Sequence, residues 1–483
     1  MSRIVLGPFN RVEGDLEVSL EPETAQGDHQ GLRVGAAYVN SPLFRGFEQM
    51  LVGRDPQDAM VIVPRICGIC SVAQSAATAA ALGDLAGLGP TPNGQRLANL
   101  VLACENLADH LSHFYLFFMP DFARDAYQAQ PWFPQVAARF KAVQGSACAD
   151  VLPARAAFLQ IMGSLAGKWP HTLSLQPGGM ARAPQAAERL RVFGLLKEFR
   201  RWLERHLFGD RLEAVAALES RAQLDAWRQG RRGDLAAFLE VADGLGLEAH
   251  GRGTDRFLSY GAYARDGGWL FPRGVLDLPA GVLQGFDPAD VQEDGHHAWL
   301  QPGPALHPSE GETLPVADKP GAYTWCKAPR WQGQVVECGA LARQAVAGHP
   351  LIRELVQTGG GNVLSRVLAR LLELALVLPA MEGWLAALDD GPCIQPARLP
   401  AAGRGVGLVE AARGALGHWL EVRDGRILRY QIIAPTTWNF SPRDRHATPG
   451  ALEQALVGLP LQDTLLVQHV VRSFDPCMVC TVH

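Results

Sequence analysis

Two pairs of cysteines at opposite ends of the chain are the residues best suited to chemistry. Cys67 and Cys70 stand in RICGIC. Cys477 and Cys480 stand in DPCMVC, close to the final residue, His483. A single CxxC motif serves thiol redox chemistry, zinc or other metals, and zinc ribbons keep their two pairs about 15–20 residues apart. Four thiolates are soft ligands for zinc, nickel, copper or iron–sulfur clusters. The sequence predicts one soft-metal site that joins both chain ends, with two unrelated motifs or a structural zinc site as alternatives.

The residues around these pairs match a known pattern. RxCGxC near the start and DPCxxCxxH at the end are the paired signatures of the large, catalytic subunit of nickel–iron hydrogenases. Further segments match in the family's order and cover essentially the whole chain: residues 11–14, 45–48, 167–171, 327–330, 410–414 and 435–439. The chain therefore resembles this large subunit throughout its length.

The resemblance implies a ligand for each metal. Cys67 and Cys477 would be terminal nickel ligands. Cys70 and Cys480 would bridge nickel to an iron that carries carbon monoxide and cyanide. Bridging thiolates hold two metals close and leave a position open for substrate, and an open position is typical of a catalytic metal. The implied reaction is the splitting of dihydrogen into protons and electrons.

Ionisable residues around the metals have roles implied by the same resemblance. Glu13 matches the glutamate that relays protons from the cysteine at the Cys477 position. Arg413 matches an arginine that overhangs the metals, with Asp109 and Asp475 around it. A guanidinium over an open metal position can act as a base or fix water and charge.

Two further ligand pockets follow from the family pattern. Thr436 matches a position whose hydroxyl donates to an iron-bound cyanide. The same pocket would include Pro435 and Ala412, and at the position of Ala412 the family usually has proline. His483 matches a histidine that binds magnesium together with Glu48 and the backbone carbonyl of Ile432. Magnesium favours a few protein ligands and several waters.

The electrons need a route out of this chain. The remaining cysteines stand singly and form no CxxCxxC run of the kind that binds iron–sulfur clusters: they are Cys104, Cys148, Cys326, Cys338 and Cys393. The resemblance places the clusters in a small subunit, so we expect an obligate heterodimer with a large apolar interface, possibly paired into a dimer of heterodimers. His171 would contact the boundary with that partner, or else be an ordinary hydrogen-bonded histidine of the core.

Two bulky residues bear on the subtype. Ile69 stands where the family commonly has valine, and Phe117 where it often has leucine. Both positions line the gas channel, where larger side chains would retard dioxygen more than dihydrogen. This combination, and the end at His483, resemble the regulatory, dihydrogen-sensing hydrogenases that signal to a histidine kinase and turn over slowly. Alternatives are neutral drift at the two positions, a respiratory uptake hydrogenase in processed form, or a hydrogenase-like structural subunit without metals.

The elements that must position these residues follow from periodicity. Residues 1 to about 45 alternate as strands, 64–245 have helical spacing, and 252–346 read as loops with short strands. We expect one helix each over 185–218 and 449–471, and helical structure over 351–388. Asp424-Gly425 joins two alternating runs within 418–435 into a β-hairpin.

These elements predict a mainly α protein with peripheral β (α+β): a large central helical bundle, an N-terminal sheet and a late β-hairpin. We expect one intertwined domain over 1–483, because the chemistry joins both ends. Its parts are an N-terminal β region (1–60), a helical core (61–250), a loop- and β-rich region (251–350), and a final part with helices, hairpin and metal-binding tail (351–483).

Composition excludes several classes of protein. Hydrophobic residues make up 48 % and charged residues 19 %, which is typical of a globular protein. The net charge is −5 with no basic block, so nucleic acid is not an expected partner. The most apolar run, from Leu371, is interrupted by Glu373 and Pro379 and is too short to span a bilayer. With no recognisable signal peptide, we expect a cytoplasmic protein.

Overall fold

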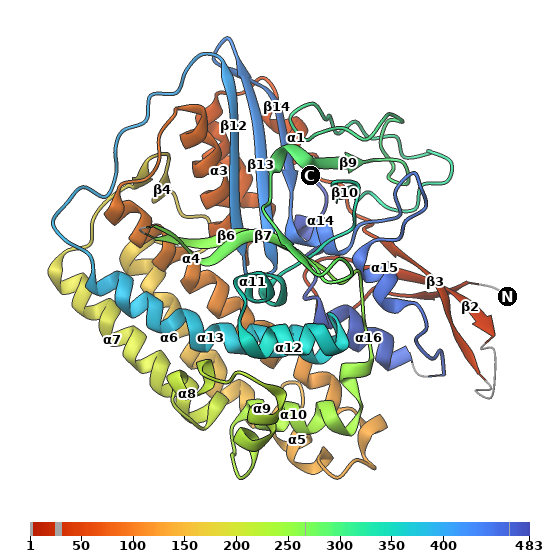
Figure 1. Cartoon of the computed structure of the whole chain (residues 1–483). Coiled ribbons are helices and arrows are strands. Elements are labelled where there is room, and N and C mark those ends of the chain that lie inside the picture. The colour runs from red at the N-terminus through yellow and green to blue at the C-terminus, as the bar shows by residue number, and fades with distance from the viewer. Residues whose placement is uncertain (1–2, 25–30, 266, 463) are drawn as a thin grey trace.

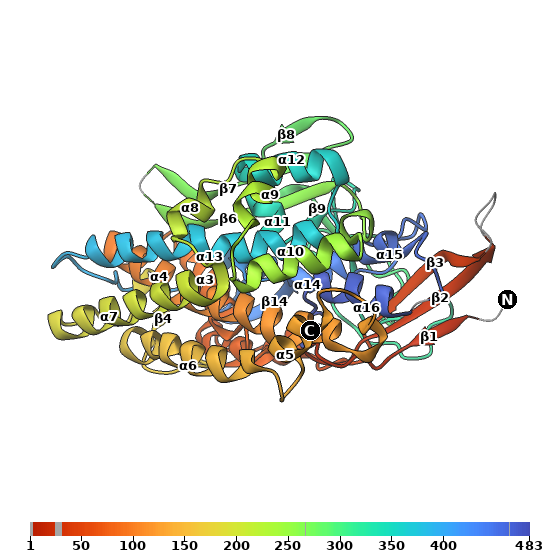
Figure 2. The same ribbon diagram turned by 90° about the horizontal axis from the view of Figure 1, so that it is seen from below.

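Long helices form the larger part of the molecule, with small sheets around them. The structure is a computed structural model that describes residues 3–24, 31–265, 267–462 and 464–483. Helices α6, α7 and α13 run side by side in both views, and the N-terminal strands lie at the opposite edge (Figures 1 and 2). The predicted α+β class, with its central helices, is confirmed. No helix of the described residues is long and apolar enough to cross a bilayer.

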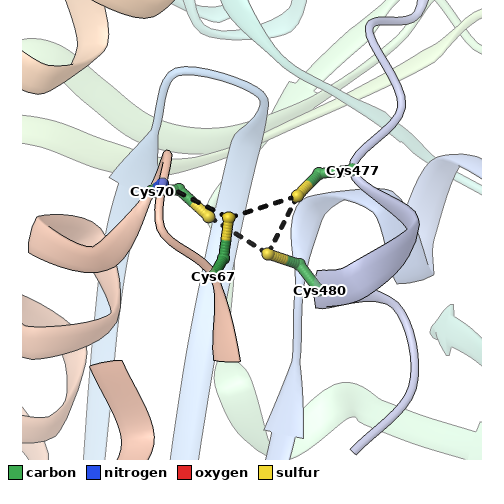
Figure 3. A group of neighbouring side chains, drawn as sticks. All are labelled: Cys67, Cys70, Cys477 and Cys480. Atoms are coloured by element: carbon green, nitrogen blue, oxygen red, sulfur yellow. Dashed lines mark hydrogen bonds between the residues drawn. The ribbon is translucent and has the colours of Figure 1, made fainter. Parts of the chain in front are cut away.

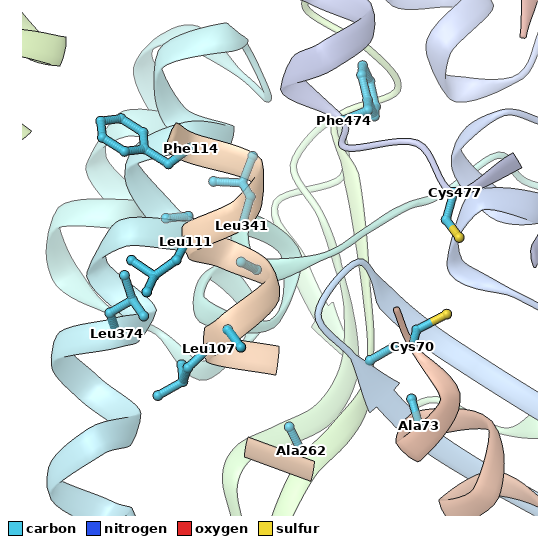
Figure 4. Packing of buried hydrophobic residues seen from close by; sticks show 14 of the residues in the cluster. Cys70, Ala73, Leu107, Leu111, Phe114, Ala262, Leu341, Leu374, Phe474 and Cys477 are labelled. Carbon is cyan, nitrogen blue, oxygen red and sulfur yellow. The ribbon is translucent and has the colours of Figure 1, made fainter. Parts of the chain in front are cut away.

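The helical core is built around α13, whose residues are buried along most of its length. Leu107 and Leu111 of α4 face Leu374 of α13 (Figure 4). Side-chain caps start two of these helices: Thr91 accepts the Gly94 amide at α4, and Asn362 accepts the Ser365 amide at α13. The long helices of this core are α3 (Ser71–Leu85), α4 (Pro92–Ser112), α6 (Ser146–Ala166), α7 (Ala186–Trp202) and α13 (Val363–Ala386).

The sheet beside α3 has one strand more than expected. The hairpin is present, with Asp424 and Gly425 at φ 52° and 70°, which a type I′ turn requires. A third strand, β12, precedes it and packs on α3: a Cβ at Gly407 would stand 2.0 Å from the Ala77 carbonyl oxygen. The predicted hairpin is confirmed; the third strand was not predicted because these glycines, which allow close packing, resemble a loop. The strands are β12 (Gly403–Ala411), β13 (Gly414–Arg423) and β14 (Arg426–Ile433).

The region 251–350 is more regular than predicted. It contains a four-stranded sheet in the order β11-β6-β7-β8, including two ten-residue strands, and a helix, α11. The prediction of loops with short strands was therefore wrong here, because Gly and Pro within long strands were interpreted as breaks. The elements are β6 (Arg256–Arg265), β7 (Gly268–Asp277), β8 (Val282–Gln284), β9 (Val291–Asp294), β10 (Ala328–Trp331), β11 (Glu337–Cys338) and α11 (Ala340–Ala347).

Three expected helical segments are interrupted at glycines. Gly209 at φ 65°, Gly360 at φ 66° and Gly458 at φ 82° adopt the positive φ with which many helices end. The prediction of one helix each over 185–218 and 449–471 was therefore wrong, whereas the helical structure predicted over 351–388 is confirmed, as two helices. The additional pieces are η6 (Leu203–Phe208), α8 (Leu212–Ala216), α12 (Pro350–Gly359), α15 (Ala451–Leu456) and α16 (Thr464–Ser473).

The segment that follows β1 meets the C-terminal tail, while the N-terminal sheet itself lies at the edge of the molecule (Figure 1). Strands β1 (Ile4–Leu6), β2 (Glu17–Thr24) and β3 (Leu32–Asn40) pair antiparallel, as expected. Between β1 and β2, Glu13 forms a parallel bridge with Cys477. The other elements are α1 (Phe47–Leu51), η1 (Pro56–Asp58), α2 (Ala59–Ile62), η2 (Val63–Ile66), η3 (His113–Phe118), η4 (Met119–Ala123), η5 (Asp125–Tyr127), α5 (Phe133–Phe140), β4 (Leu175–Gln176), β5 (Gly179–Met180), α9 (Arg221–Arg228), α10 (Asp234–Gly244), η7 (Leu247–Ala249), η8 (Pro288–Asp290), α14 (Pro435–Asn439) and η9 (Met478–Cys480).

Candidate metal centre

The four paired cysteines form one buried group of sulfurs. Their ligand atoms all lie within 4.8 Å of one another (Figure 3). The sulfurs of Cys70 and Cys480 are 3.0 Å apart, and those of Cys67 and Cys477 are 3.6 Å apart. These distances are too long for a disulfide bond, which is about 2.05 Å. Free thiolates at this spacing can hold a soft metal ion between them.

The first pair lies in a tight loop before α3. The amides of Ile69 and Cys70 donate to Cys67 Sγ at 3.3 and 3.4 Å, which orients that sulfur toward the group. Cys70 is the N-cap residue of α3, although its side chain makes no capping hydrogen bond. Local backbone geometry therefore positions this pair.

The second pair is held by residues far away in the sequence. The Met478 amide donates to the Glu13 carbonyl at 2.7 Å, and the Cys477 amide donates to Thr436 Oγ1 at 3.0 Å. Arg45 contacts the carbonyls of Ile66 and Val479, and so ties the two cysteine segments together. These contacts with distant residues hold the tail in the buried interior.

Arg413 joins two buried carboxylates beside the sulfurs. Its Nη2 lies 3.2 Å from Asp109 Oδ1 and 3.1 Å from Asp475 Oδ1. Burial raises the pKa of Asp109 to about 7, against the attraction of Arg413. Burial also opposes ionisation of Asp475, but Arg413 and His113 hold the pKa of Asp475 below its usual value. Burial therefore opposes ionisation of Asp109, while Arg413 favours it, and the two carboxyl groups titrate as an interacting pair.

Glu13 is half-buried next to the second pair. Burial raises the pKa of Glu13, and the nearby Cys67 thiolate raises it further. A carboxyl group with a raised pKa, bridged through its backbone to Cys477, is suited to accept and release a proton.

The residues expected near iron are all buried and bonded to the protein. Thr436 Oγ1 accepts the Cys477 amide, which leaves its own O–H free to donate to another group. The Pro435 carbonyl accepts from Cys338 Sγ at 3.4 Å, and the Ala412 carbonyl accepts from Arg343 Nη2 at 3.2 Å.

All three predicted magnesium ligands are buried, and two of them, Glu48 and Ile432, contact each other. Glu48 Oε1 accepts the Ile432 amide at 2.8 Å, and Thr313 donates to its other oxygen. Burial raises the pKa of Glu48 to about 7. Among the described residues, neither ring nitrogen of His483 has a hydrogen-bond partner, although the ring is buried. Burial, with the positive Lys327 and Arg45, keeps the pKa of His483 low, so a neutral imidazole is available to a cation.

The remaining predicted residues are all partly buried. Ile69 is half-buried and packs against the main core, and Phe117 is half-buried in η3. His171 Nδ1 lies 2.9 Å from the Pro64 carbonyl, and its amide donates to Ser71 Oγ. His171 is therefore hydrogen-bonded within the chain, directly beside the first cysteine loop.

Sequence reasoning missed one buried carboxylate. Glu105 of α4 accepts the amides of Val72 and Ala73 in the first turn of α3. Its signal in the sequence was a lone acid in an apolar stretch, LVLACENL.

Comparisons with known proteins were made over the whole chain. The family model described as nickel-dependent hydrogenase matches residues 45–147 and 143–483. The periplasmic [NiFeSe] hydrogenase large subunit of Desulfomicrobium baculatum is 30% identical, with 100% of this chain and 95% of the relative covered. The hydrogenase-1 large chain of Escherichia coli (strain K12) is also 30% identical, with the same coverage.

Solved structures agree with these relatives. The Ni-Fe-Se hydrogenase of D. vulgaris Hildenborough in the reduced state superposes with a TM-score of 0.84 at 29% identity, with both chains covered completely. A match in sequence and fold that spans both cysteine pairs leaves one conclusion: the chain belongs to the nickel-dependent hydrogenase family and matches its large subunits throughout its length.

Proposed function

We propose that this subunit splits dihydrogen into protons and electrons at a nickel–iron centre held by Cys67, Cys70, Cys477 and Cys480. One observation carries the proposal: in a chain of the nickel-dependent hydrogenase family, four buried sulfurs from both chain ends lie within 4.8 Å of one another. When bound, the metals supply the site that polarises dihydrogen.

The donor set fits two metals. Cys67 and Cys477 would hold nickel, and Cys70 and Cys480, whose sulfurs are 3.0 Å apart, would be shared between nickel and iron. Carbon monoxide and cyanide would be the further ligands of iron. The free O–H of Thr436 supports a cyanide on that side, beside Pro435 and Ala412.

Protons leave through this chain's own carboxyl groups. Glu13 takes the proton that reaches Cys477, since its pKa is raised and its backbone is bridged to that residue. Arg413, fixed by Asp109 and Asp475, places a positive charge beside the sulfurs.

Magnesium binds at Glu48, His483 and the Ile432 carbonyl. Support comes from the two unpartnered nitrogens of a buried histidine and from a buried carboxylate. The ion fixes the tail that carries the second pair, because a cation there joins the last residue to α1 and β14.

A small subunit with iron–sulfur clusters accepts the electrons, in an obligate heterodimer. Gly68, in the first cysteine loop, is exposed, and Leu173, two residues from His171, is 49% exposed. An exposed glycine in the cysteine loop and an exposed leucine close to His171 support a partner subunit at this face.

For the physiological role, we favour a slow, cytoplasmic dihydrogen sensor that reports to a histidine kinase. Support is limited to the bulky Ile69 and Phe117. The relatives include periplasmic and uptake enzymes, so an uptake hydrogenase is the alternative. In the sensor, Ile69→Val with Phe117→Leu increases inactivation by dioxygen, and dihydrogen changes the autophosphorylation of the kinase. Unchanged inactivation, or a kinase indifferent to dihydrogen, contradicts the sensor.

We also propose that the chain is one intertwined domain. One continuous cluster of buried apolar residues includes Cys67 and Cys70 as well as Cys477 and Cys480, and so joins both chain ends.

The proton relay gives the test of the reaction. Glu13→Gln removes the proton acceptor, so exchange between dihydrogen and deuterated water collapses while the nickel content stays at the parent level. Glu23→Gln, on the exposed end of β2, is the control. Exchange at the parent rate in Glu13→Gln contradicts the relay.

A further inference from the structure

The first amides of α3, directly after the Cys67–Cys70 loop, need hydrogen-bond acceptors from outside the helix. Cys70 is its N-cap, and Ser71, Val72 and Ala73 follow with no exposed surface. The first amides of a helix have no acceptor within the helix. A thiolate at such a position is their usual acceptor, which explains why helix N-termini lower cysteine pKa values.

Glu105 removes these amides from reach of the sulfur. Its Oε2 accepts the Val72 amide at 2.9 Å, and its Oε1 accepts the Ala73 amide at 3.0 Å. Ser71 Oγ and Trp169 Nε1 also donate to Oε2, at 3.4 and 2.9 Å. Glu105 is 2% exposed, and burial raises its pKa while the two amides and Trp169 oppose that shift. All these neighbours donate, so the side chain serves as an acceptor at both oxygens.

The two cysteines of the first pair therefore differ. Cys67 Sγ accepts two backbone amides, whereas the hydrogen bonds of the described residues give Cys70 Sγ no backbone donor, only the Cys480 sulfur. Hydrogen bonds withdraw electron density from a metal-bound sulfur and raise the reduction potential. Without backbone hydrogen bonds, the Cys70 thiolate would keep its electron pairs for donation to the metals.

We propose that Glu105 is a positioning residue of the metal centre: it occupies the first amides of α3, keeps them from the Cys70 sulfur, and fixes the Cys67–Cys70 loop against α4. This rests on the proposed nickel–iron function. It also assigns a role to Trp169, two residues before His171: the indole N–H donates to the Glu105 carboxylate and so fixes its orientation.

Two variants change the acceptor by different amounts. In Glu105→Gln one side of the carboxylate becomes an NH₂ donor, so either Val72 or Ala73 loses its acceptor. Glu105→Asp keeps both oxygens but withdraws them by one methylene. Glu453→Gln is the matched control: this carboxylate is also buried and accepts the amides of Val39 and Gly450, away from the cysteines.

The experiment is infrared spectroscopy of the assembled heterodimer, with nickel and iron measured in the same samples. Released amides turn to the Cys70 sulfur and remove electron density from iron, so the carbon monoxide and cyanide bands move to higher wavenumber. The shift is larger in Glu105→Gln than in Glu105→Asp, and Glu453→Gln keeps the parent bands.

Parent bands in both Glu105 variants at full metal content overturn the proposal. Loss of the folded heterodimer in both, with Glu453→Gln intact, also overturns it, because the proposed effect is on the loop of a folded subunit. A parent protein without nickel or without these bands would instead contradict the proposed function, before any variant is compared.

Discussion

The two cysteine segments reach the same site by opposite routes. Cys67 and Cys70 stand at the start of a buried helix, and a carboxylate from the neighbouring helix satisfies the helix end. Cys477 and Cys480 stand in a tail held by Glu13, Thr436 and Arg45. The first segment is organised by the helix that follows it. The second depends on contacts with distant residues and on its metals, so metal removal should affect it more.

Loss of one cysteine of the tail should have the largest effect. Cys480→Ser replaces a soft thiolate by a hard hydroxyl, so we expect nickel and iron to fall to background. Amide exchange then becomes fast over 474–483 but stays slow over α3, as hydrogen-exchange mass spectrometry can measure. Cys148→Ser, at a half-buried single cysteine, is the control. Equal loss of protection in both segments would contradict the comparison.

Arg413 ties the tail to α4, the helix that also supports the first segment through Glu105, because Asp109 belongs to α4 and Asp475 to the tail. Arg413→Ala leaves two buried carboxylates without a partner and should lower the free energy of unfolding by about 3–5 kcal/mol. Chemical denaturation measures this. Arg404→Ala removes an exposed partner of Glu421 on the adjacent strand and should cost less than about 1 kcal/mol. If Arg413→Ala lowered the free energy of unfolding as little as Arg404→Ala, the ion pairs of Arg413 would not stabilise the fold.

Within this comparison, Thr436 supports the tail, through its hydrogen bond with the Cys477 amide. Thr436→Val keeps the shape but leaves the buried Cys477 amide without an acceptor, at a cost of about 1–3 kcal/mol in the free energy of unfolding. Exchange of the Cys477 amide should accelerate. Thr324→Val, which removes a buried acceptor of the Ser41 amide, should cost a similar amount without affecting Cys477. If the Cys477 amide exchanged at the same rate in Thr436→Val and Thr324→Val, the hydrogen bond from this amide to Thr436 would be contradicted.

The first segment has a pH dependence of its own through His418, which contacts Gln74 of α3. Burial lowers the pKa of His418 to about 3 from 6.5, so between these values the unfolded chain binds more protons. The stability from neutral His418 is complete above pH 6.5 and is lost as the pH falls toward 3, by about 1.4 kcal/mol per pH unit. His418→Gln should flatten the dependence of unfolding free energy on pH, and the exposed His446→Gln should not. An unchanged slope in His418→Gln would exclude this origin.

Sequence reasoning succeeded where local chemistry is specific. Asp424-Gly425 encodes a turn that needs positive φ, and the CxxC signatures encode the family. It failed where tertiary packing decides: Gly405 and Gly407 form a strand because α3 lies against them. Glu105 appears in the sequence as one acid in an apolar helix, and only the packing of α4 on α3 reveals what it binds. The sensor role remains a prediction, since no contact of Ile69 or Phe117 decides it.

The metal content and infrared spectrum of the dihydrogen-treated heterodimer test the central claim most directly. A nickel–iron centre on the four cysteines predicts nickel and iron near one each per subunit, with carbon monoxide and cyanide bands that shift under dihydrogen. Zinc alone, or a protein without these bands, would contradict it.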